Sequence, residues 1–565
     1  MKEIFLFMKI LIFGRRFSLV MLLLYMFLYI PMSIYGQALQ GERVLSFGGS
    51  RSDGGRSVCV DAASNVYITG YFQDTASFND VKLISNGDTD IFLAKLDKYG
   101  DLLWVKQFGS DLRQNLILTE MGNIVKIDKK GNIYLSGIFS RSAVFGDTTL
   151  VSYGGDDIFV VKLNEKGEVI WANNYGSIGH DIVYDMTFDN NNNLILCGNL
   201  GTAPSGIAFK STKMSSYAFL AKINTKGNLR LLRSVSAQGY AEANSVAVDN
   251  VNSIYWGINF KGNLILGDRK FLSKGKFDIF LEKIDTTDNP QWYKQIGGVA
   301  DDKVSSLTIA NNNNLILTGS FEDKLEINSK VLVSQGASDF LFCEFDKSGK
   351  IVWLERFGGL LSDQGISASS LSNGNLLIGG IFQGVVASSV DTIISMGFYD
   401  IVLLNYNKNR QLIGEKQIGN EYGDFIRSLV SDSDNAYFTG RYRGDIVVNN
   451  NEIYSKGSDD VFFASLPLSL LNSGGFSSVN LLANTDNNSI NISPNPSTGN
   501  FFITSSNDPI TVNITVKNIS NKELMFLRNQ TLPTQLNLSS LSNGTYFIYI
   551  SYDSKRFIKK VIILN

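Results

Sequence analysis

Residues 90–110 read DIFLAKLDKYGDLLWVKQFGS, and they contain two short apolar runs separated by a turn. Asp90 leads the first run, Gly100 marks the turn, and Trp104 lies in the second run. The second run ends at Phe108, which Gly and Ser follow. Short apolar runs between Gly and Asp turns are typical of antiparallel β-strands.

The same marks recur along the chain, which indicates an internal repeat. Successive copies start 61, 67, 60, 61, 61 and 61 residues apart. The residues that mark these starts are Phe47, Phe108, Tyr175, Val235, Ile296, Phe357 and Ile418. Two further apolar strands and a longer polar connection precede the Asp-led strand in most copies. Four short strands per copy, with no helical period, predict an all-β chain with a seven-bladed β-propeller of four-stranded blades.

The two ends of the repeat region predict how the ring closes. The seventh copy stops at Leu466-Pro467 after its third strand, with no Trp-bearing strand behind it. At the other end of the chain, residues 43–46 stand before the first repeat start in the place of that missing strand. We therefore expect the N-terminal strand to become the outer strand of the last blade, because this pairs an otherwise free edge.

Two patterns within the repeat resemble a known family. They are GNIYLSG at Gly131–Gly137 and DIFLAKLD at Asp90–Asp97, and the repeats extend over about residues 37–467. In these patterns the chain resembles the SBBP-type repeats of bacterial β-propellers. The resemblance implies the propeller fold and leaves the function open, because one scaffold serves many functions.

The N-terminal 36 residues differ from the rest of the chain. Four basic residues lie before an apolar run at 17–34, and the small residues Gly36 and Ala38 follow that run. This order is typical of a secretory signal peptide, to which we assign residues 1–36. A single membrane anchor is the alternative, since the apolar run approaches the length that spans a bilayer.

The C-terminal part begins after a Ser-, Asn- and Gly-rich stretch at 468–488, which we expect to be a linker. Alternating strands at 489–565 then predict a small β-sandwich. Ordered motifs make this part similar to the type IX secretion sorting domain of Gram-negative bacteria. The matching residues are Pro494, Asn495, Pro496, Gly499, Gly544, Tyr546, Lys559 and Lys560. The resemblance implies export to the outer cell surface by the type IX machinery, followed by attachment to lipopolysaccharide or release; an ordinary accessory sandwich is the alternative.

Composition excludes several function classes. The formal net charge is −2, and no basic stripe is visible, which argues against nucleic-acid binding. Three Cys without a CxxC pair cannot form a disulfide framework or a zinc knuckle. His180 is the single His, which removes most His-based metal sites and Ser-His-Asp catalysis. We therefore expect no cofactor and no metal.

Candidate binding residues lie on one predicted face, where the crossing loops and the long connections meet. They are Arg51, Asp53, Arg113, His180, Asp181, Tyr240, Glu242, Asp302, Asp363, Tyr422 and Asp424. The repeated Asp residues among them could form a cation-binding ring, although repeated Asp usually caps loop N–H groups. The same capping is expected of the Asp residues that lead the third strands, which are Asp90, Asp157, Asp278, Asp339, Asp400 and Asp460. The non-repeated Tyr, Arg, His and Glu are typical of a sugar- or protein-binding rim.

Together these features favour a secreted or surface-attached propeller that acts as a non-catalytic binding or adhesion module for a glycan or a surface protein. The alternative is a polysaccharide-active hydrolase or lyase with carboxylates and Tyr on the channel face, since carboxylate-based glycoside hydrolysis needs no His. A third hypothesis is a structural component of the cell-surface layer.

Overall fold

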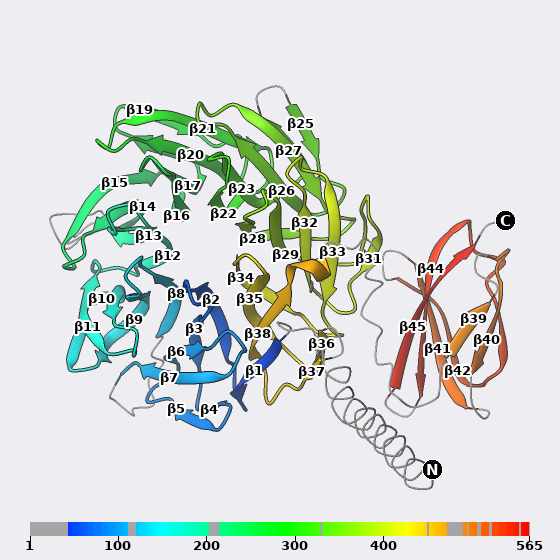
Figure 1. Cartoon of the computed structure of the whole chain (residues 1–565). Coiled ribbons are helices and arrows are strands. Elements are labelled where there is room, and N and C mark those ends of the chain that lie inside the picture. The colour runs from blue at the N-terminus through cyan, green and yellow to red at the C-terminus, as the bar shows by residue number, and fades with distance from the viewer. Residues whose placement is uncertain are drawn as a thin grey trace, which may run out of the picture. The chain divides into compact units, whose positions relative to one another are not determined.

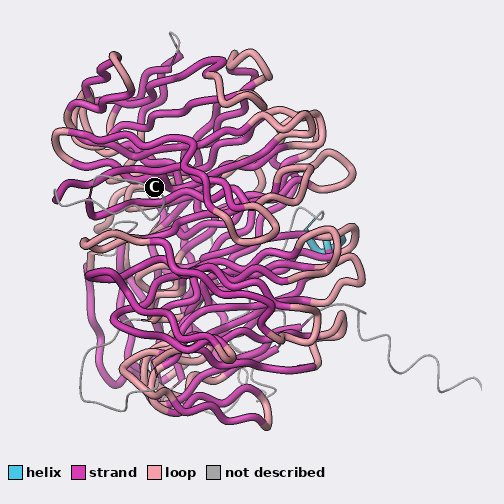
Figure 2. Tube along the Cα trace, turned by 90° about the vertical axis from the view of Figure 1, so that its left-hand side faces the viewer, coloured by secondary structure: helices cyan, strands magenta, loops and turns pink. Residues whose placement is uncertain are grey.

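The computed structural model describes residues 43–110, 120–202, 214–327, 330–448, 451–471, 490–493, 497–505, 510–518, 522–552 and 555–563. These residues form strands and loops apart from one short 3₁₀ helix, η1 (Leu468–Leu471), so the all-β prediction is confirmed (Figure 2). The predicted signal peptide at 1–36 and most of the expected linker lie outside the described residues. Within the described part of the chain, no helix is long and apolar enough to cross a membrane.

From Arg43 to Pro467 the main sheets share one antiparallel four-strand order (Figure 1). The innermost strands are β2 (Gly54–Val60), β8 (Met121–Ile127), β12 (Ile182–Phe188), β16 (Tyr240–Val248), β22 (Asp302–Ile309), β28 (Gln364–Ser370) and β34 (Phe425–Ser431). The second strands are β3 (Val66–Phe72), β9 (Ile133–Phe145), β13 (Leu194–Thr202), β17 (Ile254–Lys261), β23 (Leu315–Phe321), β29 (Leu376–Phe382) and β35 (Asn435–Tyr442). The third strands are β6 (Asp90–Leu96), β10 (Thr148–Leu163), β14 (Met214–Ile223), β20 (Asp278–Ile284), β26 (Asp339–Phe345), β32 (Asp400–Tyr406) and β38 (Asp460–Pro467). The outer strands are β7 (Leu102–Phe108), β11 (Val169–Tyr175), β15 (Leu229–Ala237), β21 (Pro290–Gly298), β27 (Ile351–Phe357), β33 (Leu412–Ile418) and β1 (Arg43–Gly49).

The first and last parts of this region meet in one sheet, as predicted. Strand β1 pairs antiparallel with β38, and the register runs from Arg43 opposite Ser465 to Phe47 opposite Val461. The sheet order is β34-β35-β38-β1, so the N-terminal strand takes the outer position. In Figure 1 the sheets succeed one another around a central opening, and the blue β1 lies beside the yellow β38.

The long connections between second and third strands are more ordered than the sequence suggested. In several sheets they fold into hairpins, which are β4 (Thr75–Phe78) with β5 (Val81–Ile84), β18 (Asn263–Leu266) with β19 (Arg269–Leu272), β24 (Lys324–Ile327) with β25 (Lys330–Val333), β30 (Val385–Ala387) with β31 (Thr392–Ile394), and β36 (Ile446–Val448) with β37 (Asn451–Ile453). Strands β4, β18 and β24 also pair with the outer strand of the preceding sheet. The prediction of a polar connection missed these strands because each is only three or four residues long, which is too short for a clear alternation of apolar residues.

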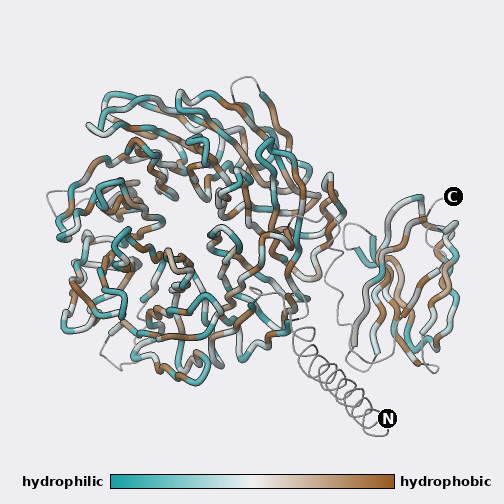
Figure 3. Tube along the Cα trace, viewed as in Figure 1, coloured by the Kyte–Doolittle hydropathy of each residue, from teal (hydrophilic) through white to brown (hydrophobic). Residues whose placement is uncertain are grey.

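The hydrophobic core lies between adjacent sheets. One cluster joins Phe47 and Phe463 of the closing sheet to Phe92 of the next, with Phe78 stacked 5.2 Å from Phe47. Apolar residues follow the strands and polar residues mark many of the loops in Figure 3. The three thiols, Cys59, Cys197 and Cys343, are free and buried within these clusters, as expected for small hydrophobic residues.

The folded repeat region extends beyond the expected boundary at 467. Leu471 of η1 is buried against the last sheet. Its carbonyl oxygen accepts a hydrogen bond of 3.0 Å from the side-chain amide of Asn405. The short helix therefore belongs to the repeat region, because its apolar Leu residues pack on the core rather than on solvent.

The C-terminal part contains two antiparallel sheets. One has the order β39 (Ile490–Ser493), β40 (Asn500–Ser505) and β43 (Thr534–Asn537), and the other has the order β42 (Glu523–Thr531), β41 (Thr511–Asn518), β44 (Gly544–Tyr552) and β45 (Lys555–Ile563). Residues of both sheets, including Phe501, Ile514 and Ile548, contribute to one hydrophobic cluster.

The residues of the predicted sorting motif divide between turns and strands. Gly499 has φ +98°, and a Cβ there would lie 2.5 Å from Ser539 Cα, so only Gly fits. Tyr546 in β44 donates a hydrogen bond of 2.7 Å to the Ser542 carbonyl. Gly544 begins β44, and Lys559 and Lys560 lie in β45. Pro494, Asn495 and Pro496 are outside the described residues.

Candidate binding site at the central channel

A cavity of about 360 Å³ lies at the centre of the repeat region, and every innermost strand contributes to its lining. Each of these strands carries a β-bulge near its start, which leaves one residue without a partner in the second strand. We call these unpaired residues the bulge ring. Its members are Arg56, Asn123, Tyr184, Asn244, Ser305, Ile366 and Arg427, and all of them line the cavity. A bulge re-aims its side chain, and here the side chains differ from sheet to sheet.

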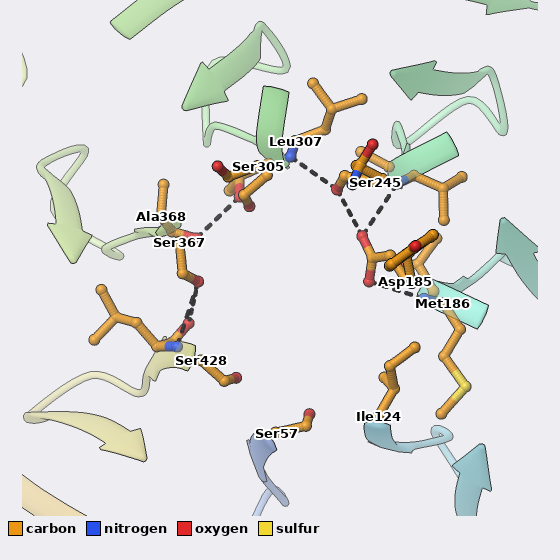
Figure 4. Close-up of a pocket in the computed structure, with 18 of the residues that line it drawn as sticks. Ser57, Ile124, Asp185, Met186, Ser245, Ser305, Leu307, Ser367, Ala368 and Ser428 are labelled. Atoms are coloured by element: carbon orange, nitrogen blue, oxygen red, sulfur yellow. Dashed lines mark hydrogen bonds between the residues drawn. The ribbon is translucent and has the colours of Figure 1, made fainter. Parts of the chain in front are cut away.

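The residues that follow the bulge ring bind neighbouring sheets together. Ser245 Oγ accepts a hydrogen bond of 2.9 Å from the Leu307 N–H, and Ser428 Oγ accepts one of 3.2 Å from the Val58 N–H. The same link joins Ser57 to the Val125 N–H and Ser367 to the Leu429 N–H. Innermost strands are sheet edges, so these side chains satisfy backbone N–H groups that the sheets leave unpaired. Figure 4 shows the labelled serines arranged around the cavity.

Removal of one of these links is expected to destabilise the protein. In Ser245→Ala the Leu307 N–H loses its acceptor, which should lower the free energy of unfolding by about 1–2 kcal/mol in a urea titration. Ser433→Ala is the matched control, because Ser433 lies in an exposed turn. Equal unfolding free energies for the two variants would show that the links contribute no stability.

Asp185 is the one acidic residue among those that line the cavity. Its carboxylate accepts hydrogen bonds from Ser245 Oγ (2.6 Å), the Val246 N–H (3.1 Å) and the Met186 N–H (2.8 Å) (Figure 4). Burial raises the pKa of Asp185, and the positive charge of Lys126 opposes that rise. Asp185 therefore acts as a structural link in the place that Ser holds in most other sheets.

Two predicted site residues meet a member of the bulge ring. The Glu242 carboxylate accepts hydrogen bonds from the Tyr240 hydroxyl at 3.0 Å and from the Tyr184 hydroxyl at 3.2 Å. Tyr240 also packs edge-on against Phe277 with ring centroids 5.9 Å apart. These half-buried groups offer an acceptor and two hydroxyls beside the cavity, which suits hydrogen bonding to a polar ligand.

The repeated Asp candidates lie elsewhere, inside the loops. Asp53, Asp181, Asp302, Asp363 and Asp424 are all fully buried. Asp53 accepts hydrogen bonds from the Gly49 N–H (2.7 Å) and the Gln73 N–H (2.9 Å), and Asp363 binds the Gly359 and Gln383 N–H groups in the same way. Their carboxylates face the loop backbone, which matches the capping interpretation. None of these five carboxylates lines the central cavity.

Each buried Asp is close to the Asp that leads the third strand of the preceding sheet. Burial raises the pKa of Asp53 and Asp363 to about 7 and that of Asp302 to about 8, and their neighbours Asp460, Asp339 and Asp278 add to the rise. Glu120 occupies this position in the second sheet, where burial and Asp90 raise its pKa to about 8. Glu120 was not predicted from the sequence, because six extra residues before it shift its repeat out of alignment.

One junction between sheets lacks this acidic pair. Tyr217 and Ala241 stand where the two carboxyl groups would be, between the sheets that contain β12 and β16. Tyr184, Tyr240 and Glu242 belong to these same two sheets. The junction that lacks the acidic pair is therefore also the place where the non-repeated polar groups Tyr184, Tyr240 and Glu242 lie.

The remaining predicted residues are at the surface or outside the described part. The His180 ring is exposed, and its Nδ1 lies 2.9 Å from Asp156 Oδ2. Arg51 and Tyr422 are also exposed, and no described contact joins them to the cavity lining. Arg113 lies outside the described residues. The described residues contain no group of three or more His, Cys, Asp or Glu placed to hold a metal ion.

Sequence comparison identifies the C-terminal part. Residues 491–564 match the family model described as a secretion system C-terminal sorting domain. This domain indicates export by the type IX route and attachment at the cell surface, in bacteria of the Bacteroidetes type. The type IX secretion machinery is therefore an implied partner.

Comparison of the repeat region is less specific. An uncharacterised WD repeat-containing protein of Acanthamoeba polyphaga mimivirus is 23% identical over 59% of this chain, and the match spans 30% of that protein's length. Among solved structures, a puromycin hydrolase (TM-score 0.40, 11% identity) covers 81% of this chain and 59% of its own. The match to the plexin A4 extracellular region (TM-score 0.38, 10% identity) covers 92% of this chain and 67% of the plexin chain. The WD repeat-containing relative fits a propeller-like fold, and none of these similarities carries an inference about activity.

Proposed function

We propose that this chain is a secreted, surface-displayed seven-bladed β-propeller that binds an extracellular ligand at its central channel without chemical conversion. In this proposal residues 1–36 are the signal peptide, 37–467 with the short helix η1 form an SBBP-type propeller closed by its N-terminal strand, and 489–565 form the sorting β-sandwich. Its partner is an extracellular glycan or surface protein, and the exported chain is attached to lipopolysaccharide or released.

The observation that carries the proposal is the bulge ring. The residues just after it are mostly Ser and hold the sheets together, whereas the ring itself varies among Arg, Asn, Tyr, Ser and Ile. A structural position in a repeat tends to keep its residue type, so the variation at the ring favours contact with a ligand. Cavities lined by a few convergent polar groups are the usual place for such contact.

The pKa shifts favour binding over lyase chemistry. A general base Tyr needs a pKa close to the working pH. Burial and the Glu242 charge instead raise the pKa of Tyr240 to about 12, and the same causes raise that of Tyr184 further. Both hydroxyls therefore keep their protons at neutral pH and donate them to Glu242, which leaves their oxygens able to accept hydrogen bonds from a ligand.

The test is a screen of the purified protein on immobilised microbial and plant polysaccharides, with retention and released fragments scored together. We expect retention without fragments. The double variant Tyr184→Phe/Glu242→Gln should then bind at least about tenfold more weakly, because it removes hydrogen bonds made to the ligand. The control is His180→Gln, which changes an exposed group away from the cavity lining.

Two results would contradict the proposal. Released fragments would indicate the hydrolase or lyase, and Glu242 and Asp185 would become the residues to test. Retention that the double variant leaves unchanged would place the binding surface outside the channel.

A further inference from the structure

The bulge ring has two charged members, and they are neighbours. Arg56 belongs to β2 and Arg427 to β34, the first strands of two adjacent sheets. The Val58 N–H donates to Ser428 Oγ at 3.2 Å, which ties these two strands together one or two residues from the arginines. Every other member of the ring is uncharged.

Neither arginine is neutralised by an acidic residue. Among the described residues, no carboxylate oxygen lies within 4.0 Å of the Arg56 or Arg427 guanidinium. Arg56 instead contacts Met121 Sδ at 3.4 Å and lies 5.5 Å from the centre of the Tyr71 ring. The chain as a whole has a net charge of −2, so this pair of positive charges is a local feature and does not follow from the overall composition.

A third arginine adds to this positive region. Arg441 of β35 lies 4.8 Å from the centre of the Phe425 ring, and its Nη1 is 3.5 Å from Asp459 Oδ2. Asp459 also binds Arg443 at 2.9 Å, so one carboxylate is shared between two arginines. Burial, together with the charges of Arg56 and Arg441, lowers the pKa of Arg427 to about 10. An anion beside these groups would relieve their mutual repulsion.

We propose that Arg56 and Arg427 together bind the carboxylate of a uronate residue in an anionic extracellular glycan at the channel mouth. The proposal rests on the proposed function and names the ligand class of that same site. Two guanidinium forks match a carboxylate geometrically and form charge-assisted hydrogen bonds to it.

The rest of the ring selects a sugar over an acidic peptide. Asn123, Tyr184, Asn244 and Ser305 supply amide and hydroxyl groups to the cavity, and Glu242 stands behind Tyr184. Sugar hydroxyls both donate and accept hydrogen bonds, which such groups can match. Ile366 is the one aliphatic member of the ring, so the ring itself offers few of the apolar anchors that peptide side chains use.

The experiment is a calorimetric titration of the purified protein with trigalacturonate, triglucuronate and trimannuronate, each paired with its methyl ester. The ester keeps the sugar and removes the charge. We expect at least one acid to bind, with its ester at least about tenfold weaker. Arg56→Gln/Arg427→Gln should lose that preference and melt no lower than the parent, because a repulsive pair is removed. Arg269→Gln, on the exposed hairpin strand β19, is the charge-matched control and should bind as the parent does.

The outcomes separate this inference from the proposed function. Equal binding of acid and ester, or unchanged acid binding by the double arginine variant, would overturn the inference and leave the channel as a neutral-glycan site. Binding of none of the three acids would overturn it as well. Binding of an acidic peptide such as triglutamate in preference to the uronates would replace the glycan with a protein ligand.

Discussion

A chain shortened to begin at Phe47 is expected to unfold several degrees below one shortened to begin at Gly41. The shorter chain lacks Arg43–Ser46, four of the five residues that pair with β38. The edge of β38 then faces solvent, and the partly buried Val44 and Leu45 no longer cover the core clusters beside them. We expect the free energy of unfolding to fall by about 3–5 kcal/mol, which is in the range for the loss of strand contacts. Thermal unfolding followed by circular dichroism measures this change.

The chain that begins at Gly41 is the control, because it keeps β1 whole. Coincident melting curves for the two chains would mean that the pairing of β1 with β38 adds no stability. Limited proteolysis gives a second readout. The open chain should be cut first within the sheet that contains β34, β35 and β38, because that sheet has lost its outer strand.

The second expected result is that the protein is more stable at pH 5 than at pH 8.5. Burial raises the pKa of Asp157 and Asp400 to about 7, and burial together with a neighbouring carboxyl raises those of Asp53, Asp302 and Glu120. A carboxyl with a raised pKa in the folded state favours folding while it is protonated there. Its contribution is complete below its pKa in the unfolded chain, near 4, and is lost as the pH rises through about 7 to 8.

Carboxylates with a lowered pKa change the stability with pH in the opposite direction, because they stabilise the folded state while they are ionised. Their effect falls in another pH range. Lys222 lowers the pKa of Asp189, and Arg410 lowers that of Glu344. The stability that these two contribute is lost only as the pH falls below about 4. The melting temperature should therefore pass through a maximum near pH 5 and fall by about 5 °C or more by pH 8.5, since a few kcal/mol is enough for that shift.

Asp302→Asn tests the cause of this slope. The amide oxygen can still accept the 2.6 Å hydrogen bond from the Gly298 N–H, but the side chain no longer ionises. The variant should be more stable than the parent at pH 8.5, and its stability should change less between pH 5 and pH 8.5. Asp285→Asn is the control, because hydrogen bonds in its exposed turn lower the pKa of Asp285 and keep it ionised throughout this range. A pH profile of Asp302→Asn that parallels that of the parent would exclude the buried pairs as its source.

The strands could be predicted from the sequence because the same strand patterns recur in successive copies of the repeat. A 61-residue spacing and alternating apolar residues located the four-strand order and the pairing of β1 with β38. The hairpins β4–β5 and β24–β25 were missed, since runs of only four residues carry little periodic signal. Their strands are held by pairing with a preceding sheet, which is a long-range contact that local sequence does not encode.

The site was predicted only in part, for a related reason. Tyr240 and Glu242 stood out because they break the repeat, and the structure places them together with Tyr184. Arg56 and Arg427 were not recognised, because their shared position depends on a bulge whose residue type changes from sheet to sheet. Ser245, Ser306, Ser367 and Ser428 recur every 61 residues. Each directly follows a member of the bulge ring, so this spacing in the sequence already marked the position of the ring.

The most direct test of binding at the channel is a crystal structure of the protein with the saccharide that the polysaccharide screen selects. We expect a sugar in the central cavity, in contact with members of the bulge ring and with the hydroxyl of Tyr184 or Tyr240 beside Glu242. A saccharide bound only to the outer hairpins or to the C-terminal sheets, with the cavity holding solvent alone, would contradict it.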